Sequence, residues 1–443
     1  MALADYDTLA ARHADVLAPN RRRQALWVGG ALLLALYSVY VWFAFDVSTA
    51  LGRANMERAE LLALDSYAHK VHVEMSLRDP SELEVELEGN RLNRYETLPD
   101  WITPAAAGWQ VEMNAGYEID LRPDGLRMLD EDGTLLADIA FAEEGPVLLS
   151  APQPWMKVAP NKIEGRPDSY ARFIVTASKV TLMNYFTGWE NFWFDWSSPL
   201  HGMGPLQAAA LVFSAERVDP AQSNLSLVVS EFLGNQDWQH GEVLGALGIT
   251  VLMAVVGTLM AALCALPLAF LAANNITPSA WIRGPFKRLF DFLRGVDALI
   301  WSLIFIRAFG LGPLSGILAI WFTDTGTFGK LFSEAIENAD RRQVEGMQAT
   351  GASPVQRTWF GIMPQIMPVF ISQSLYFLES NTRSATVIGM LGAGGIGLKL
   401  ADTMRTGQDW ENTMYIIVLI IGIVILMDNL SARLRRRLIE GSK

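Results

Sequence analysis

The chain has 443 residues, of which 51% are hydrophobic and 19% are charged, against about 25% charged residues in an average globular chain. The formal net charge of -12 excludes a nucleic-acid-binding protein, because contacts with phosphates require a basic surface. The single cysteine, Cys264, excludes an internal disulfide framework and a cysteine-based zinc site. With only five histidines, we expect no metal site.

The charged residues are distributed unevenly along the chain. Residues 46–240 contain 14 Lys and Arg against 30 Asp and Glu, whereas the rest of the chain contains 21 basic and 17 acidic residues. We therefore expect an apolar membrane protein that carries one acidic, water-soluble insert at 46–240. Residues 1–24 precede the first apolar run and form an N-terminal segment.

Long uncharged runs predict where the chain crosses the membrane. Residues 24–45, 243–282 and 358–378 contain no charged residue, and a spanning helix needs about 20 mostly apolar residues. The sequence therefore predicts an all-α polytopic membrane protein with about six transmembrane helices. We place them at about 25–45, 246–272, 290–309, 311–328, 364–384 and 412–430.

Basic residues near the ends of these runs indicate the orientation. Clusters of Lys and Arg lie at 21–23, 283–288, 341–342 and 433–437. With six spans, all four clusters fall on one side, which the positive-inside rule identifies as the cytoplasm. Both termini are then cytoplasmic, and the insert 46–240 is periplasmic.

The insert shows the pattern of a small β-rich domain. Polar and apolar residues alternate at 71–75, 83–87 and 117–121, which predicts half-buried strands at about 70–150. Aromatic residues are dense between Phe186 and Trp196. We favour a segment at the outer membrane surface for this cluster, where such residues are enriched; the alternatives are the core of the insert and a docking face.

A polar stretch, 329–357, separates the fourth and fifth apolar runs. Its charged residues indicate a solvated helix, Gly351 predicts a tight turn, and Ser353 followed by Pro354 is typical of the start of a second helix. This elbow, at about 333–364, is exposed to the cytoplasm and suited to docking of a soluble partner.

The elbow resembles the cytoplasmic signature of the permease subunits of ATP-binding-cassette (ABC) importers with a methionine-permease-like fold, the type I importer fold. In that signature a Glu-Ala-Ala triplet is followed after three residues by Gly and, nine residues later, by Ile-x-Leu-Pro. Glu345, Gly351 and Pro364 occupy the Glu, Gly and Pro positions at this spacing. The departures are Gly346, Met347, Gly361 and Met363. The resemblance implies an ATPase-coupling elbow that includes Glu345, Ala349, Gly351, Ala352 and Pro364.

Residues 243–440 show a narrower resemblance, to the permeases of phosphonate importers. Its most specific feature is the string from Glu379 to Gly397. It implies import of phosphonate or a related phosphorus oxyanion across the bacterial inner membrane by a homodimer of this chain. The implied partners are two ABC ATPase subunits and a periplasmic substrate-binding protein. No P-loop motif occurs in the sequence, so we expect no enzymatic activity and no cofactor on this chain, with ATP and Mg on the partner ATPase.

Two features of the same string are candidates for the pathway or its gate. The first is a glycine-rich run that matches G-x-G-x-x-G but lies between apolar runs, where a dinucleotide site is not expected; its glycines are Gly392, Gly394, Gly395 and Gly397. We interpret this run as close helix packing or as a gate.

The second feature is a charged pair four residues apart, Glu379 and Arg383, which share one helix face. The pair either locks two helices together or leaves Arg383 to offer a cation to an anionic substrate, with hydrogen bonds added by Asn381 and Ser384.

Two other functions remain open. The same fold could import another small solute, such as an amino acid. Alternatively, the chain could be a membrane-anchored sensor that works through its acidic insert. A sensor leaves the elbow unexplained, and a third class, a membrane-embedded hydrolase, lacks a convincing nucleophile and base.

Overall fold

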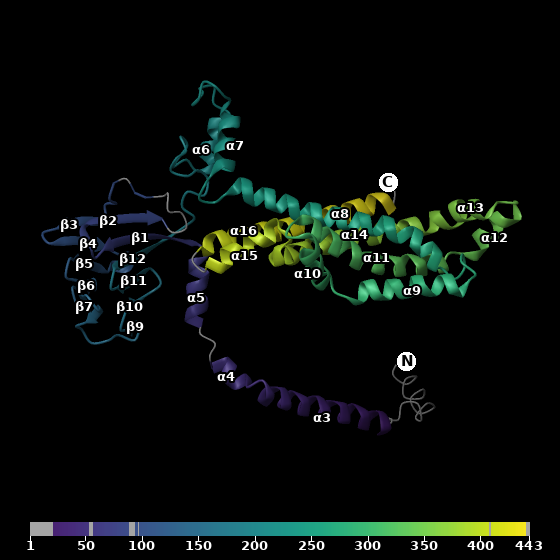
Figure 1. Cartoon of the computed structure of the whole chain (residues 1–443), viewed down its shortest axis with the longest axis horizontal. Coiled ribbons are helices and arrows are strands. Elements are labelled where there is room, and N and C mark those ends of the chain that lie inside the picture. Colours follow the sequence, from purple (N-terminus) through teal and green to yellow (C-terminus); the bar gives the residue numbers. More distant parts are fainter. Residues whose placement is uncertain (1–20, 53–55, 88–93, 96, 407–408, 440–443) are drawn as a thin grey trace, which may run out of the picture. The chain divides into compact units, whose positions relative to one another are not determined.

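The computed structural model describes residues 21–52, 56–87, 94–95, 97–406 and 409–439. The chain forms two compact units, residues 1–63 and 64–443. The first unit contains α3 (Arg21–Ala44), α4 (Val47–Gly52) and most of α5 (Met56–Asp65) (Figure 1). Most of the predicted N-terminal segment, 1–24, lies outside the described residues.

Helix α3 matches the first predicted span. Its residues Gln24–Ala44 form a 21-residue stretch that is long and apolar enough to cross a membrane. A helix that is apolar on all sides is suited to lipid.

The second unit begins with two six-stranded antiparallel sheets. The first has the order β2-β1-β12-β11-β10-β9, and its strands are β1 (Ala68–Ser76), β2 (Asp79–Leu87), β9 (Met156–Ala159), β10 (Lys162–Gly165), β11 (Ala171–Thr176) and β12 (Lys179–Thr187). The second runs in chain order through β3 (Ile102–Ala105), β4 (Gly108–Glu112), β5 (Glu118–Arg122), β6 (Gly125–Leu129), β7 (Leu135–Ala142) and β8 (Gly145–Leu148), with the 3-10 turn η1 (Asn114–Gly116) between β4 and β5. Side chains from both sheets, such as Val73 and Leu121, share one apolar core.

The strands continue to Thr187, well beyond the 70–150 range expected from the sequence. The strand β12 accounts for part of the difference, because its residues from Val180 to Tyr185 are buried in succession, whereas β11 alternates between buried and half-buried residues. A strand buried on both faces shows no period-two pattern, so periodicity alone does not assign it. The order of the first sheet also depends on a distant pairing, in which Ala68 lies opposite Thr187.

The rest of the second unit is helical (Figure 1). Its helices are α6 (Pro205–Val212), α7 (Asn224–Gly234), α8 (His240–Ala272), α9 (Ala280–Gly295), α10 (Ala298–Phe309), α11 (Pro313–Glu337), α12 (Arg341–Ala349), α13 (Pro354–Gln356), α14 (Met363–Ile388), α15 (Gly395–Thr406) and α16 (Trp410–Ile439). Two π-helical segments, η2 (Arg357–Ile362) and η3 (Gly389–Ala393), precede and follow α14.

Length and composition identify three of the described helices as candidate spans: α3, α8 and α16. A fourth candidate is the bent pair formed by residues 354–393 and 395–405, whose two arms differ in direction by 60°. The predicted single span at 290–309 is wrong, because α9 ends at Gly295 and α10 begins at Ala298. Asp297 caps α10 by accepting a hydrogen bond from the Leu299 amide at 2.8 Å, which starts a new helix at that point.

Small residues allow the helices of this part to pack closely. A Cβ atom on Gly257 of α8 would lie 2.8 Å from the Ile320 side chain of α11, and one on Gly326 of α11 would lie 2.7 Å from the Phe290 carbonyl oxygen of α9. Close approach through Gly and Ala is typical of helix packing in membranes.

The aromatic residues between Phe186 and Trp196 pack largely against other parts of the chain, and their favoured place at the outer membrane surface stays a prediction. Trp189 and Phe192 pack against Trp238, His240 and Tyr415, with ring centroids of Phe192 and Trp238 4.9 Å apart. Edge-to-face contacts of this kind stabilise aromatic clusters beyond the burial of their area. The cluster therefore joins the end of the insert to the first turns of α8 and α16.

Candidate functional site: the coupling elbow and the α14–α15 break

The predicted elbow exists, and local interactions define it. Helix α12 ends in a turn at Gly351, whose φ is +80°, a conformation that side-chain-bearing residues rarely adopt. Ser353 then caps α13: its Oγ accepts from the Gln356 amide at 3.3 Å, and the Ser353 amide donates to Gln356 Oε1 at 2.8 Å. Pro354 follows at the first helical position.

The elbow is held against the start of α14. The Asp340 amide, just before α12, donates to Gln365 Oε1 at 2.8 Å, and Gln365 Nε2 donates to the Gly361 carbonyl at 2.6 Å. Gly361 is buried against Val344 and Met347 of α12. Hydrogen bonds and packing thus join the elbow to the start of α14.

Most side chains of the elbow are exposed and therefore accessible to a partner protein. Of the five residues assigned to coupling, Glu345, Ala349, Gly351 and Pro364 are exposed, and Ala352 is half-buried. Val355, just after the turn, is 77% exposed, and Trp359 and Phe360 are also exposed. Val355 belongs to the polar stretch 329–357, whereas Trp359 and Phe360 lie at the start of the uncharged run 358–378. Exposed apolar groups indicate contact with another protein or with a membrane.

The glycine-rich run is the break between α14 and α15. Gly392, Gly394 and Gly395 all have φ between +72° and +114°. A β-carbon on Gly397 would overlap the Thr386 carbonyl oxygen, and one on Gly395 would overlap Thr250 Oγ1. The run also lies against the turn before α11, because the Gly312 amide donates to the Gly392 carbonyl at 3.2 Å. The arrangement supports backbone conformation and close packing as the reasons for these glycines.

Asn381 is the centre of a buried polar cluster in the helical core. Its Nδ2 donates to Thr258 Oγ1 of α8 at 2.8 Å and to Asp324 Oδ2 of α11 at 2.5 Å. Asn381, Thr258 and Asp324 are all buried. The cluster connects three helices, and sequence reasoning missed Asp324 and Thr258. An acidic residue within the predicted span 311–328 was the available signal, because ionisable groups at membrane depth are costly.

The predicted pair of Glu379 and Arg383 is present on α14. Arg383 Nη1 donates to Glu379 Oε1 at 3.2 Å. The Arg383 side chain is 54% exposed, whereas that of Glu379 is 15% exposed. Among the residues that the structure describes, the Ser384 hydroxyl donates within its own helix, to the Ser380 carbonyl at 3.4 Å. Asn381 therefore faces the core, whereas Arg383 faces outward and has guanidinium N–H groups beyond those that bind Glu379.

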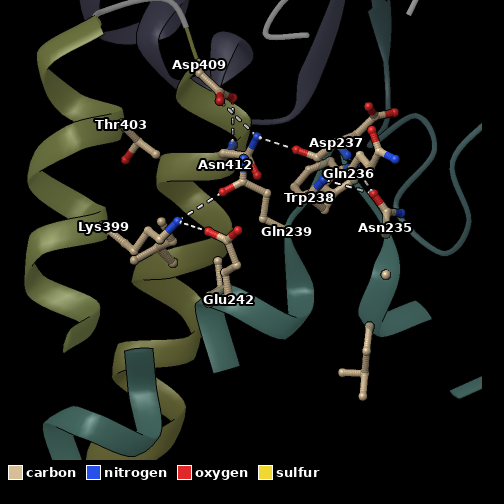
Figure 2. Close-up of a pocket in the computed structure, with 14 residues that line it drawn as sticks. Asn235, Gln236, Asp237, Trp238, Gln239, Glu242, Lys399, Thr403, Asp409 and Asn412 are labelled. Carbon is tan, nitrogen blue, oxygen red and sulfur yellow. Dashed lines mark hydrogen bonds and ion pairs between the residues drawn. The ribbon is translucent and has the colours of Figure 1, made fainter. Parts of the chain in front are cut away.

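Figure 2 shows a polar pocket where the first turns of α8 and α16 meet α15. The volume of the pocket is about 1080 Å³ when the adjoining space open to solvent is counted. Lys399 of α15 forms an ion pair with Glu242 of α8 and donates to Gln239 Oε1 at 3.1 Å. Asn412 of α16 donates to Asp409 at 2.9 Å. Sequence reasoning missed this pocket, because its residues come from three separate segments.

The helical half matches a known family. Residues 265–440 match the family model for the inner membrane component of binding-protein-dependent transport systems. A phosphite transport system permease protein of Stutzerimonas stutzeri is 39% identical over 187 residues, or 42% of this chain and 68% of that protein. A protein of Escherichia coli K12, named as a cryptic phosphonate transport system permease, is 49% identical over 123 residues, or 28% of this chain and 100% of that protein. Among solved structures, the methionine ABC transporter MetNI in its inward-facing conformation gives a TM-score of 0.41 at 18% identity, over 44% of this chain and 95% of that chain.

The family model and the two related permease sequences define a membrane permease of an ABC import system. The chain belongs to the family of inner membrane components of binding-protein-dependent transport systems. The matched range, 265–440, contains the elbow, Asp324, Asn381 and the α14–α15 break. The β-rich insert lies outside this range.

Proposed function

We propose that this chain imports phosphite, phosphonate or a closely related phosphorus oxyanion, as the transmembrane subunit of an ATP-driven transporter. The observation that carries the proposal is the 39% identity to a phosphite transport system permease protein over 68% of that protein. The 49% identity to the phosphonate permease named above supports the same class of substrate.

In this proposal the elbow is the contact with the ATPase that supplies the energy for transport. In the proposal, α12 and α13 insert into a groove on a separate ABC ATPase, with Glu345, Ala349, Gly351, Ala352 and Pro364 at the contact. The exposed Val355 and Trp359 support this role. ATP and Mg belong to that subunit, and this chain binds no cofactor. Two copies of the chain form the pathway, each copy docks one ATPase, and an external binding protein delivers the anion.

The proposed topology has six crossings of the bacterial inner membrane, with both termini in the cytoplasm and residues 46–240 in the periplasm. The crossings are α3, α8, α10, α11, α14 and α16. Helix α10 has only 12 residues, about 18 Å at 1.5 Å per residue, so it traverses part of the hydrocarbon layer. The basic residues Arg283, Lys287 and Arg288 on α9 support a position of that helix at the cytoplasmic surface in this topology.

The test is ATP hydrolysis by the chain co-purified with its ATPase and reconstituted in lipid. The binding protein is added empty or loaded with phosphite, methylphosphonate, phosphate or methionine. Stimulation by a loaded phosphorus oxyanion alone supports both the importer and its substrate class. Stimulation by methionine alone overturns the substrate and keeps the importer.

Gly351→Ala provides the control for coupling, because it alters the elbow turn and leaves the pathway residues unchanged. Failure of any ATPase to co-purify with the unaltered chain would overturn the importer proposal, and the acidic insert would then become the subject of the search for function.

A further inference from the structure

Helices α6 and α7 form a hairpin that is well built but apolar on its outside. Its inner side packs Ala208 and Leu227 against Phe194 and Leu200. Asn224 fixes the connecting loop: its Nδ2 donates to the Leu211 carbonyl at 2.9 Å and to the Glu216 carbonyl at 2.8 Å. The hairpin therefore has a core and fixed loop hydrogen bonds of its own, and its exposed side chains are a stable surface.

That surface carries large apolar side chains. Leu206 is 85% exposed and Phe213 is 90% exposed. On α7, Leu225, Val229 and Leu233 are exposed at four-residue spacing, which places them in one stripe along the helix. Groups of exposed apolar residues indicate contact with another protein or with a membrane.

The hairpin is adjacent to a membrane-spanning helix. Five residues, 235–239, separate the end of α7 from the start of α8. The contact is close, because a Cβ atom on Gly241 of α8 would lie 2.7 Å from the Leu233 carbonyl oxygen of α7. In Figure 1, α7 runs across the direction of α8, as a helix on a membrane surface does relative to a spanning helix. Trp193, which is partly exposed, packs against Phe232 of α7, and Trp is enriched at membrane boundaries.

The distribution of charge favours lipid over a protein partner. Residues 196–215 contain no Asp, Glu, Lys or Arg, and α6 lies within this stretch. The loop between the two helices carries Glu216, Arg217 and Asp219. On α7 the one charged residue is the half-buried Glu231, which lies two positions from Val229 and from Leu233 and so on another face than the apolar stripe. A binding-protein docking face would be expected to offer polar and charged groups around its apolar contacts, which α6 does not.

We propose that the α6–α7 hairpin lies in the bilayer boundary beside the first turns of α8, with Leu206, Phe213 and the stripe on α7 inserted among phospholipids. Interfacial helices bury their apolar face about 5–10 Å into the headgroup and acyl boundary. Because the loop carries no excess of basic residues, zwitterionic lipid is sufficient. The proposal depends on α8 crossing the membrane and is independent of the substrate proposed above.

The test uses the full chain with Cys264→Ala, in nanodiscs of phosphatidylcholine, with single cysteines carrying an environment-sensitive fluorophore. The probes are Leu206→Cys and Phe213→Cys, both at exposed positions where the substitution spares the core. Val158→Cys in β9 is the matched exposed apolar control, and Leu263→Cys within α8 is the lipid-facing reference. The quencher is a phosphatidylcholine with a nitroxide near the headgroup end of its acyl chain.

We expect at least about twofold quenching at residues 206 and 213, no quenching at 158, and a blue-shifted emission at both hairpin positions. Quenching no greater than at Val158→Cys would overturn the proposal. A fluorophore that is quenched neither by the lipid nitroxide nor by iodide added to the aqueous phase would also overturn the proposal. It would show that protein covers the position. Disulfide cross-linking between two chains through Phe213→Cys would identify that cover as a second copy.

Discussion

Asn381 Nδ2 donates to Asp324 Oδ2 over 2.5 Å and so joins α14 to α11 inside the helical core. The two residues are 57 positions apart, and Thr258 of α8 completes the cluster. Because α14 also follows the elbow, the cluster fixes the helix that would transmit motion from an ATPase. A buried polar pair with few other partners makes this region sensitive to the loss of either member.

We predict that Asn381→Leu lowers the free energy of unfolding by about 1–3 kcal/mol, because Asp324 then remains buried without its donor. Combining Asn381→Leu with Asp324→Leu should recover much of this loss, since replacing both partners by apolar groups can be nearly neutral. The measurement is the thermal unfolding midpoint of the full chain in detergent. Ser384→Ala is the control, because that hydroxyl donates within its own helix. Additive losses in the double variant would contradict the prediction.

Local patterns in the sequence predict the helix-turn-helix shape of the elbow and most of the long apolar helices well. The uncharged runs correspond to α3, α8, α14 and α16, and the cap at Ser353 is determined by residues no more than three positions away. Such features depend on neighbouring residues, so the sequence pattern contains them directly.

Features that depend on distant residues escape this reasoning. The pairing of β1 with β12 joins Ala68 to Thr187, and the partner of Asp324 lies on another helix. The break between α9 and α10, at Gly295–Asp297, could not be predicted from the sequence for a different reason. A capping Asp and a charged residue within a membrane span look the same in a one-dimensional pattern.

Gly351→Ala should weaken coupling and leave the chain folded. The φ of +80° costs a residue with a side chain about 1–2 kcal/mol, although the space around this position is open. We expect lower substrate-stimulated ATP hydrolysis, unchanged membrane insertion, and an unfolding temperature lowered by no more than about a few degrees. Gly346→Ala is the matched control, because Gly346 also has open space but lies within α12, where Ala favours the helix. Equal effects of the two variants would rule out the turn as the cause.

Gly397→Ala should destabilise the α14–α15 break. Its β-carbon would overlap the Thr386 carbonyl oxygen and lie 2.9 Å from the Met390 amide nitrogen, so the backbone must move. We expect a loss of about 1–3 kcal/mol, in the range of overpacked cores, read as a lower unfolding temperature in detergent. Gly422→Ala in α16 is the matched control, since nothing lies within 4 Å of that position. A wild-type unfolding temperature for Gly397→Ala would show that the break adjusts at little cost.

Protonation of Glu164 should make the β-rich domain less stable in acid. Burial raises the pKa of this carboxyl, but hydrogen bonding to Lys162 and the charge of Arg172 outweigh it and hold the pKa below its ordinary value of 4.5. The nitrogen–oxygen distances are 2.9 Å to Lys162 and 2.7 Å to Arg172. Because the folded-state pKa is depressed, the stabilisation is present above pH 4.5 and is lost as the pH falls through the folded-state value.

Glu164→Gln should therefore speed hydrogen exchange in β10 and β11 of the full chain near neutral pH, and the difference from the unaltered chain should disappear in acid. Mass spectrometry of the peptides that contain these strands provides the measurement. Glu143→Gln, exposed in the turn between β7 and β8, is the control. A difference that persists at the lowest pH would mean that the charge of Glu164 is not the cause.

Substitutions at Arg383 and Glu379 distinguish two roles of this ion pair. Either it only stabilises α14, or Arg383 also binds the transported anion. The Arg383 side chain is 54% exposed and forms an ion pair with the more buried Glu379. If the guanidinium meets the anion, Arg383→Gln should lower the maximal rate of ATP-driven phosphite uptake into proteoliposomes about tenfold, equivalent to about 1.4 kcal/mol. Arg383→Lys should retain part of the rate, because the charge remains while the planar, bidentate geometry is lost. Glu379→Gln is the discriminating control: it removes the pair and leaves the cation, so uptake should stay near that of the unaltered chain. A loss with Glu379→Gln as large as that with Arg383→Gln would assign the pair to helix structure alone.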